Sequence, residues 1–294
     1  MSYTGIMTEP AESPVIPAVA ASAASVELLA DAPAGDPTWQ ACLALVGPRT
    51  LLAFDYDGTL APIVTDITAA WMTDTMQAAV MRLLGLASSR VAIVSGRESD
   101  DVRRFFERVL PLAPGFIVGN HGADHLEPAE IAPRLAVWQP ILAAAVAKVP
   151  GAELEPKSLG FSLHWRQSAD PALAERVLGE AARSLQDAQV IDGKFVFNVL
   201  PKEAPHKGHA LAELAADGDF DHVLFVGDDV TDELAFAHAY ALPFTGIRVG
   251  EPAAAGTRAA YWVRDQRGVE ELLRRLTALL KEQAPAQSVG SLAP

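Results

Sequence analysis

The chain has little cysteine, little positive charge and no long apolar run. Cysteine occurs once among 294 residues, at Cys42, which excludes an intrachain disulfide framework and a cysteine-based metal site. Lys and Arg number 23 against 37 Asp and Glu, and the net charge of −14 argues against nucleic acid, which needs a basic surface. No apolar run reaches the roughly 18 residues that cross a bilayer. We therefore expect a globular protein, monomeric and cytoplasmic.

The first 48 residues contain no Lys or Arg and are rich in Ala and Pro. Residues 18–25 have mostly small side chains, as a signal-peptide cleavage region does, but no basic segment precedes them and prolines interrupt any apolar core. We predict a mobile tail over residues 1–48, within which Trp39–Leu45 forms a short helix against the domain. Residues 283–294 are predicted to be a loose C-terminus.

Short apolar runs alternate with helical patterns over residues 49–122 and 206–282. The runs expected to form buried strands are Leu51–Phe54, Val91–Val94, Phe116–Val118, His222–Val226, Ile247–Val249 and Tyr261–Val263. This alternation predicts an α/β fold, with a Rossmann-like, doubly wound parallel sheet covered by helices on both faces. Ligands of such folds bind beyond the carboxyl ends of the strands.

Residues 123–205 follow a different pattern. Apolar and polar side chains alternate along Leu159–Arg166 and again along Lys194–Leu200, which is typical of half-buried antiparallel strands. Pro133–Val149 and Ala172–Leu185 are predicted helices. We interpret this insert as an α+β cap domain that acts as a lid over the core.

Polar residues lie at the carboxyl ends of four of the predicted strands, at Asp55, Ser95, Asn120 and Asp228. In the first cluster, Asp55–Thr59, one carboxylate can attack phosphorus while the carboxylate of Asp57 shuttles a proton. Gly58 permits a sharp turn and Thr59 adds a hydroxyl donor. A strand followed by an ordinary Asp-Gly turn is the competing interpretation, and only the distant clusters favour a phosphate site.

A second acidic cluster follows the strand that ends at Val226. It contains Asp228, Asp229, Asp232 and Glu233, which is more carboxylate than helix capping requires. Opposite Asp55 and Asp57, such a cluster suits Mg²⁺, a hard cation that keeps waters and leaves a position for a phosphate oxygen. We predict that Asp228 is a direct ligand, whereas Asp229 and Asp232 orient ligands and waters.

Two further residues suit a phosphate. Lys207, at the start of a predicted helix, would keep the carboxylates ionised and meet a phosphate as a point charge. Ser95 offers a hydroxyl and a backbone N–H at a helix entrance. Each is weak evidence alone, because most lysines are solvated at a surface and Ser95-Gly96-Arg97 is also an ordinary turn.

Four motifs, taken in chain order, resemble the haloacid dehalogenase superfamily of phosphohydrolases: Asp55–Thr59, Ser95–Arg97, Lys207-Gly208 and Gly227–Glu233. More narrowly, residues 49–281 resemble the bacterial trehalose-6-phosphate phosphatases. The narrower resemblance depends on Gly119–Gly122 and on two pairs in the insert, Glu155 with Lys157 and His164 with Arg166.

This resemblance implies a role for each site residue. Asp55 would be the nucleophile that forms an aspartyl-phosphate, and Asp57 would protonate the leaving sugar hydroxyl and then activate water. Asp55, the backbone carbonyl of Asp57 and Asp228 would hold Mg²⁺, while Ser95 and Lys207 would clamp the phosphate. The other residues expected to bind substrate are Thr59, Gly96, Arg97, Asn120, His121, Glu155, Lys157, His164, Arg166 and Asn198.

One position departs from the family pattern. The chain reads Asn198-Val199-Leu200-Pro201 where the family usually has a Glu, a basic residue and Pro. The amide of Asn198 therefore replaces a carboxylate that, by the resemblance, binds sugar hydroxyls. The amide still donates and accepts hydrogen bonds. We expect catalysis to survive and sugar selectivity to be affected.

The leading hypothesis is a Mg²⁺-dependent phosphatase that releases trehalose from trehalose 6-phosphate in trehalose biosynthesis. A related phosphatase for sucrose phosphate or mannosyl-phosphoglycerate is the alternative enzyme. A phosphorylatable module like a response-regulator receiver is a different class, against which Asp57 and the large insert argue. A sugar-phosphate sensor without turnover would require a broken catalytic motif, and none of the motifs is broken.

Overall fold

The computed structural model describes residues 27–29, 36–64, 70–124, 128–193, 195–252 and 256–283. Within these ranges, no helix is both long enough and apolar enough to cross a membrane. The expected loose C-terminus over 284–294 and most of the expected N-terminal tail, residues 1–26 and 30–35, lie outside the described residues.

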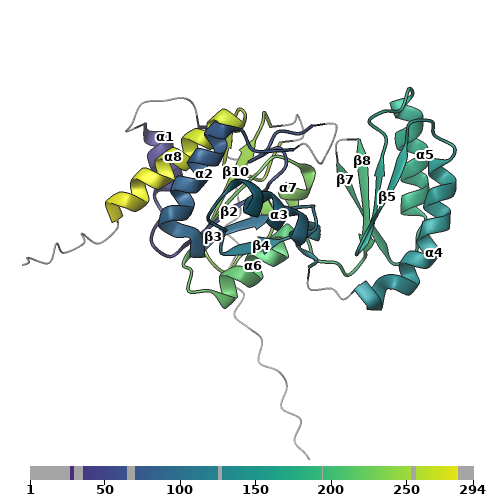
Figure 1. Cartoon of the computed structure of the whole chain (residues 1–294), viewed down its shortest axis with the longest axis horizontal. Helices are drawn as coiled ribbons and strands as arrows, with labels where there is room; N and C mark the ends of the chain where they lie inside the picture. The colour runs from purple at the N-terminus through teal and green to yellow at the C-terminus, as the bar shows by residue number, and fades with distance from the viewer. Residues whose placement is uncertain are drawn as a thin grey trace, which may run out of the picture.

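A seven-stranded parallel sheet forms the core of the protein, in the order β1-β11-β10-β9-β2-β3-β4 (Figure 1). Its strands are β1 (Glu27–Leu28), β2 (Thr50–Phe54), β3 (Val91–Val94), β4 (Phe116–Val118), β9 (His222–Gly227), β10 (Phe244–Val249) and β11 (Tyr261–Val263). Every neighbouring pair is parallel. The predicted α/β core and its six strands are therefore confirmed, with one or a few more residues at some strand ends.

Helices cover both faces of this sheet, as the pattern of β2 requires. Leu52 and Phe54 pack in one apolar cluster with α1, α2, α3 and α8, whereas Leu51 and Ala53 pack in another with α6 and α7. Successive side chains of a strand point to opposite faces, so a continuous apolar strand needs a cover on each side. The helices are α1 (Pro37–Leu43), α2 (Asp74–Ala87), α3 (Ser99–Val109), α6 (Lys207–Asp217), α7 (Val230–Phe236) and α8 (Gln266–Gln283).

Two parts of the expected mobile tail belong to the folded core. Residues 27 and 28 add β1 to the edge of the sheet beside β11, and the Leu29 N–H donates to the Trp262 carbonyl at 2.8 Å. Helix α1 docks through buried Trp39 and Cys42, close to the predicted Trp39–Leu45 helix. The low charge and the high Ala and Pro content of residues 1–48 favoured a mobile tail in the sequence analysis. In the structure, a few buried apolar side chains such as Trp39 and Cys42 are enough to hold a short segment against the core.

The cap domain has a four-stranded antiparallel sheet, in the order β5-β6-β8-β7, with helices on its outer face (Figure 1). Its elements are α4 (Pro128–Val146), β5 (Glu153–Lys157), β6 (Gly160–His164), α5 (Pro171–Arg183), β7 (Ala188–Gly193) and β8 (Val196–Pro201). Phe161 and Leu163 pack with both helices in one apolar cluster. The predicted α+β insert is confirmed, but β5 and β7 were not foreseen, and α4 begins five residues earlier than predicted.

The polar face of the cap sheet is turned toward the core. Ser162 and His164, which alternate with Phe161 and Leu163 along β6, line a cavity that core residues line as well. A hydrogen bond links a cap loop to the core, since the Ser158 N–H donates to Glu98 Oε1 at 3.0 Å. This arrangement places an antiparallel sheet opposite the strand ends where the candidate residues lie.

Candidate active site

A cavity of about 900 Å³ lies between the carboxyl edge of the core sheet and the cap. This volume is in the range of small-molecule sites. Core residues that line it include Asp55, Asp57, Gly96, Arg97, His121, Lys207, Asp228 and Asp229, and cap residues that line it include Glu155, Lys157, Ser162, His164, Arg166, Phe195 and Asn198. The fold thus brings together residues that are more than 170 positions apart.

Asp55 and Lys207 form a buried ion pair in this cavity. Asp55 follows β2 and is 4% exposed, whereas Lys207 begins α6 and is 2% exposed. The Lys207 Nζ lies 2.9 Å from Asp55 Oδ1 and 2.7 Å from Asp232 Oδ1. Burial lowers the pKa of Lys207, but the charges of Asp232 and Asp55 raise it more, so the ammonium stays protonated. A buried carboxylate with one fixed cation is suited to act as a nucleophile on an anionic substrate.

The carboxylates of Asp55, Asp228 and Asp232 approach one another closely enough to hold a cation, with one oxygen of each within 4.8 Å of the others. Burial raises the pKa of Asp228 to about 8, and the charges of Asp232 and Asp229 contribute to this increase. Burial also raises the pKa of Asp55. Crowded, buried oxygens of this kind fit a hard divalent cation, which would stabilise their ionised forms.

Within this group, Asp232 is already committed to other partners. One of its oxygens accepts from Lys207 Nζ, and the other accepts from the backbone N–H groups of Asp228 and Asp229, each at 2.9 Å. Asp55 and Asp228 therefore remain as the side chains suited to direct ligation. Asp232 fixes the loop that carries Asp228, and Asp229 caps α7 through a reciprocal pair of hydrogen bonds with Asp232.

Gly58 and Thr59 bring the first acidic loop against the second. Gly58 has φ +82°, and a Cβ at this position would lie 2.1–2.3 Å from three atoms of the Asp228 carboxyl group. Thr59 is fully buried and its hydroxyl donates to Asp228 Oδ1 at 3.4 Å. The Asp-Gly-Thr sequence thus serves two needs, a left-handed backbone and a close approach to Asp228.

Arg97 holds the side chain of Asp57 in place. Its Nε and one terminal nitrogen donate to the two oxygens of Asp57, each at 2.6 Å. The guanidinium also lies 4.9 Å from the centre of the Phe105 ring, so aromatic packing fixes its plane. A planar, bidentate pair of this type sets the orientation of a carboxylate more firmly than a lysine could.

The loop after β4 contains two residues in the left-handed region, Asn120 with φ 50° and His121 with φ 56°. The His121 ring lies against Gly96, where a Cβ would approach its Cε1 to 2.4 Å. Its Nδ1 is buried and has no hydrogen-bond partner within the described structure. Burial lowers the pKa of His121 to about 3, and Lys207 and Lys157 add to the decrease. A neutral imidazole with an unused polar atom therefore lines the cavity.

On the cap side, Glu155 is the centre of a polar group. Its Oε1 lies 2.6 Å from Lys157 Nζ, and its Oε2 lies 2.9 Å from His164 Nε2. Burial raises the pKa of Glu155, but the hydrogen bonds from His164 and Lys157 lower it more, to about 2. A second pair lies on the neighbouring strands, where the Ser162 hydroxyl donates to Asn198 Oδ1 at 2.8 Å.

Three of the predicted substrate-binding residues do not line the cavity in the described structure: Thr59, Ser95 and Asn120. Ser95 is 1% exposed, and its hydroxyl accepts from the Arg97 N–H at 3.2 Å. The Asn120 side chain donates to Asp124 Oδ1 at 2.9 Å. Ser95 and Asn120 thus hydrogen-bond within the loops that carry Arg97 and His121, whereas Thr59 hydrogen-bonds to Asp228.

Sequence reasoning assigned no site role to several residues of the cavity wall, among them Ser162, Phe195 and Arg248. The alternating pattern of β6 correctly placed Ser162 on the same face as His164, but no substrate contact was assigned to it. Arg248 lies at the carboxyl end of β10 and donates to Glu233 Oε1 at 2.8 Å, so its place at a strand end was a usable signal. Phe195 has φ 62°, which no sequence pattern indicates.

Comparison with known proteins shows that the chain is similar to trehalose phosphatases. Residues 53–251 match the family described as trehalose-phosphatase. Probable trehalose-phosphate phosphatase 9 of Oryza sativa subsp. japonica is 32% identical over 306 residues, which cover 89% of this chain and 80% of the rice protein. Probable trehalose-phosphate phosphatase 4 of the same plant is 31% identical over 254 residues, covering 78% of this chain and 66% of that protein.

A solved structure has a similar fold. The C-terminal domain of trehalose-6-phosphate phosphatase from C. albicans superposes with a TM-score of 0.69 and covers 87% of this chain and 99% of its own. The sequence identity of this pair is 23%, so the likeness concerns the fold alone. It shows that a parallel core with an antiparallel cap is shared between the two proteins.

Proposed function

The chain belongs to the trehalose-phosphatase family, and from this we propose that it hydrolyses trehalose 6-phosphate to trehalose and phosphate. The observation that carries the proposal is the pairing of the buried Asp55–Lys207 ion pair with a polar cap wall in one cavity. The core side has the groups for phosphoryl transfer, and the cap side has groups that hydrogen-bond hydroxyls. A sugar phosphate needs both.

In the proposed reaction, a carboxylate oxygen of Asp55 attacks phosphorus as the bond from phosphorus to the sugar oxygen breaks. Asp57 donates a proton to the leaving sugar oxygen. Water then attacks the aspartyl-phosphate while Asp57 takes its proton, which releases phosphate and restores Asp55. Lys207 balances the charge of the phosphate oxygens throughout, from a position fixed by Asp232.

We propose Mg²⁺ as the cation of the acidic cluster. Asp55, Asp228 and the backbone carbonyl of Asp57 would hold it, while Asp232 and Asp229 keep their positions in the surrounding loop. When bound, it supplies positive charge to the phosphate oxygens. The donor set contains only oxygen, which favours Mg²⁺ over softer metals.

We further propose that residues 123–205 act as a lid that recognises the sugar through hydrogen bonds to its hydroxyl groups. Glu155, Lys157 and His164 present hydrogen-bonding groups on one face, and Ser162 and Asn198 present a second pair beside them. Asn198 keeps hydrogen-bonding capacity in place of the usual carboxylate of the family. This position is the one on which selectivity between related disaccharide phosphates depends.

The test is phosphate release from a panel of sugar phosphates, with and without Mg²⁺. Trehalose 6-phosphate should be the best substrate by kcat/KM, EDTA should abolish turnover, and Mg²⁺ should restore it. A higher kcat/KM for sucrose phosphate or mannosyl-phosphoglycerate would assign the enzyme to a different substrate. Binding without turnover on every member of the panel would indicate a sensor.

A parallel measurement tests the intermediate. Asp55→Asn keeps the shape of the side chain but removes the nucleophile, so turnover should fall below detection. Brief acid quenching of the wild-type enzyme should trap phosphate covalently on the protein, and Asp55→Asn should trap none. Near-normal turnover by Asp55→Asn would exclude the proposed mechanism.

A further inference from the structure

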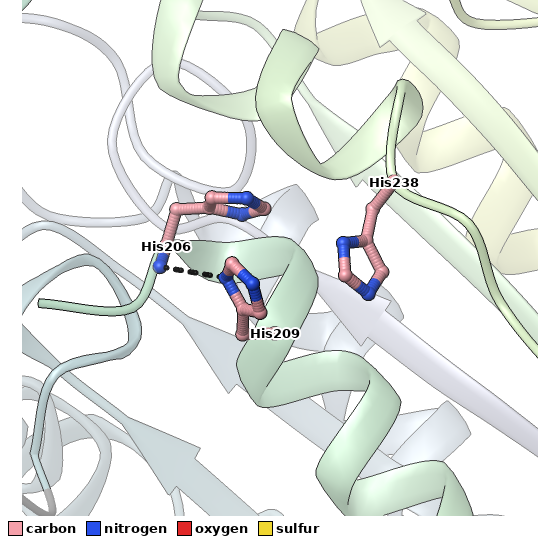
Figure 2. A group of neighbouring side chains, drawn as sticks. All are labelled: His206, His209 and His238. Carbon is pink, nitrogen blue, oxygen red and sulfur yellow. Dashed lines mark hydrogen bonds between the residues drawn. The ribbon is translucent and has the colours of Figure 1, made fainter. Parts of the chain in front are cut away.

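Three imidazoles converge outside the active-site cavity, where the start of α6 meets the end of α7 (Figure 2). His206 and His209 belong to the first turn of α6, and His238 follows α7. The ring centres of His206 and His209 are 4.0 Å apart, and His238 lies 5.5 Å from the first and 4.9 Å from the second. One nitrogen from each ring lies within 4.8 Å of the other two.

Gly208 makes this convergence possible. A Cβ at residue 208 would lie 2.7 Å from the Cβ of His238 and 2.8 Å from Cε1 of the His206 ring. Any larger residue at position 208 would displace the His206 ring and the side chain of His238. The close approach of α6 to the turn after α7 is therefore built into the packing of the two elements and does not depend on the histidines alone.

The surroundings of His206 and His238 favour the neutral imidazole, the form that binds a metal ion. Burial, together with charge repulsion from His209 and His238, lowers the pKa of His206 to about 4. Burial and His209 likewise lower the pKa of His238. Protonating one ring beside two others is unfavourable, whereas a metal ion shares its charge with all three nitrogens at once.

We propose that His206, His209 and His238 form a binding site for one divalent transition-metal ion of the Zn²⁺ class. Three imidazole nitrogens and a water complete a tetrahedral set, and imidazole favours Zn²⁺, Co²⁺, Ni²⁺ or Cu²⁺ over Mg²⁺. Within the described structure, none of the three histidines lines the cavity that holds Asp55 and Asp228. The site is thus distinct from the carboxylate cluster in both place and ligand chemistry.

Metal binding at this site competes with the cap of α6. The His206 Nδ1 accepts from the Gly208 N–H at 3.0 Å, and the His209 Nδ1 accepts from the His206 N–H at 3.4 Å. A neutral imidazole has one lone pair, so a ring that binds the ion gives up its backbone hydrogen bond. Metal binding should therefore change the hydrogen bonds of the first turn of α6, which also contains Lys207 between His206 and Gly208.

The experiment uses the full chain without a histidine tag, saturated with Mg²⁺ so that the carboxylate site is occupied. Titration with Co²⁺ is followed by visible absorption, because tetrahedral imidazole-bound Co²⁺ absorbs far more strongly than octahedral oxygen-bound Co²⁺. We expect a strong spectrum that saturates at one equivalent and disappears when Zn²⁺ is added. In a ¹⁵N-labelled sample, Zn²⁺ should also shift the Gly208 amide signal.

His209→Gln is the main variant, because His209 is exposed and its replacement leaves the core intact. It should weaken Co²⁺ binding by about tenfold or more, and His238→Gln should do the same. Glu213→Gln, an exposed change on the same helix, and Asp228→Asn, a change in the carboxylate cluster, should both keep the spectrum.

The proposal is overturned if wild-type protein gives no strong Co²⁺ spectrum, or if His209→Gln titrates like wild type. Loss of the spectrum in Asp228→Asn but not in His209→Gln would place the ion at the carboxylates and would also overturn it. The melting temperature of each variant is measured alongside, so that lost binding is read only from folded protein. Co²⁺ titration of His238→Gln is the second, independent test of the site.

Discussion

The Arg97 guanidinium donates two hydrogen bonds of 2.6 Å to Asp57, one to each carboxylate oxygen. The two residues come from the ends of neighbouring strands, β2 and β3, and the pair is supported by the Phe105 ring beneath the guanidinium. A group that must first donate and then accept a proton benefits from a fixed direction. Arg97 is therefore a positioning residue for the proposed acid and base.

Asp57→Asn should separate the two chemical steps. It should lower kcat for trehalose 6-phosphate by about 10²–10⁴-fold, the usual contribution of general acid–base catalysis. With p-nitrophenyl phosphate, whose leaving group needs no proton, the first step should survive while hydrolysis of the intermediate stalls. Rapid mixing should then show a burst of about one p-nitrophenolate per enzyme. A slow linear release without a burst would contradict the assigned role.

Lys207→Met should cost both activity and stability. The substitution leaves Asp55 and Asp232 buried without their shared cation, and breaking a buried pair in this way costs about 3–5 kcal/mol. Urea unfolding in the absence of metal measures the loss. Lys202→Met, an exposed lysine a few residues earlier, is the matched control and should stay within about 0.5 kcal/mol of wild type. Equal stability of the two variants would refute the pairing.

Gly58→Ala should damage the acidic cluster, because the new methyl group would overlap the Asp228 carboxyl group at a left-handed backbone position. Strain of this kind costs about 1–3 kcal/mol, and displacement of Asp228 should raise the Mg²⁺ concentration needed for half-maximal activity. Gly47→Ala is the control, since nothing lies within 4 Å of a Cβ there. Unchanged Mg²⁺ dependence in Gly58→Ala would argue against Asp228 as a ligand.

Glu155→Ala tests whether the cap reads the sugar. Trehalose 6-phosphate should lose kcat/KM by an amount equivalent to about 1–3 kcal/mol, the cost of a hydrogen-bonded group left without its partner. Hydrolysis of p-nitrophenyl phosphate, which has no sugar hydroxyls, should change far less. Glu175→Ala, exposed on the outer helix α5, should affect neither substrate. Equal losses on both substrates would assign Glu155 to the fold.

The same residue predicts a pH dependence of stability. The pKa of Glu155 is lowered from 4.5 to about 2, so the hydrogen bonds to its carboxylate and its ion pair with Lys157 contribute fully above pH 4.5 and are lost as the pH falls toward 2. The difference in Tm between wild type and Glu155→Gln should therefore be largest near neutral pH and shrink below pH 4.5. A difference that stays constant from pH 7 to pH 3 would show that these pairs do not stabilise the fold.

Much of the fold follows from local patterns. The six apolar runs that were predicted as strands are strands, because a parallel sheet buried on both faces needs nearly continuous apolar residues. The weaker strands β5 and β7 escaped prediction because half-exposed cap strands carry mixed polar and apolar residues, with Pro156 inside β5 and Asp192 inside β7. The start of α4 was predicted five residues too late, at Pro133, because proline is common in the first turn of a helix and rare in its interior.

The sequence by itself determined which residues gather at the edge of the sheet. Asp55, Lys207 and Asp228 each stand at the end of a strand or the start of a helix, and parallel strands bring their carboxyl ends to one edge. That conclusion needs only periodicity and the rules of α/β topology. These rules predict which residues lie at the same edge of the sheet, but they do not predict which side chains hydrogen-bond to one another.

Only the tertiary structure decided the partners. Asp232 binds Lys207 and the Asp228 loop, Ser95 turns its hydroxyl toward the Arg97 backbone, and His238 meets the imidazoles of α6 across the helix interface. Hydrogen bonds and ion pairs act over about 3 Å, so they depend on side-chain packing between segments far apart in the chain. No local pattern encodes distances of that size, and the packed core sets them.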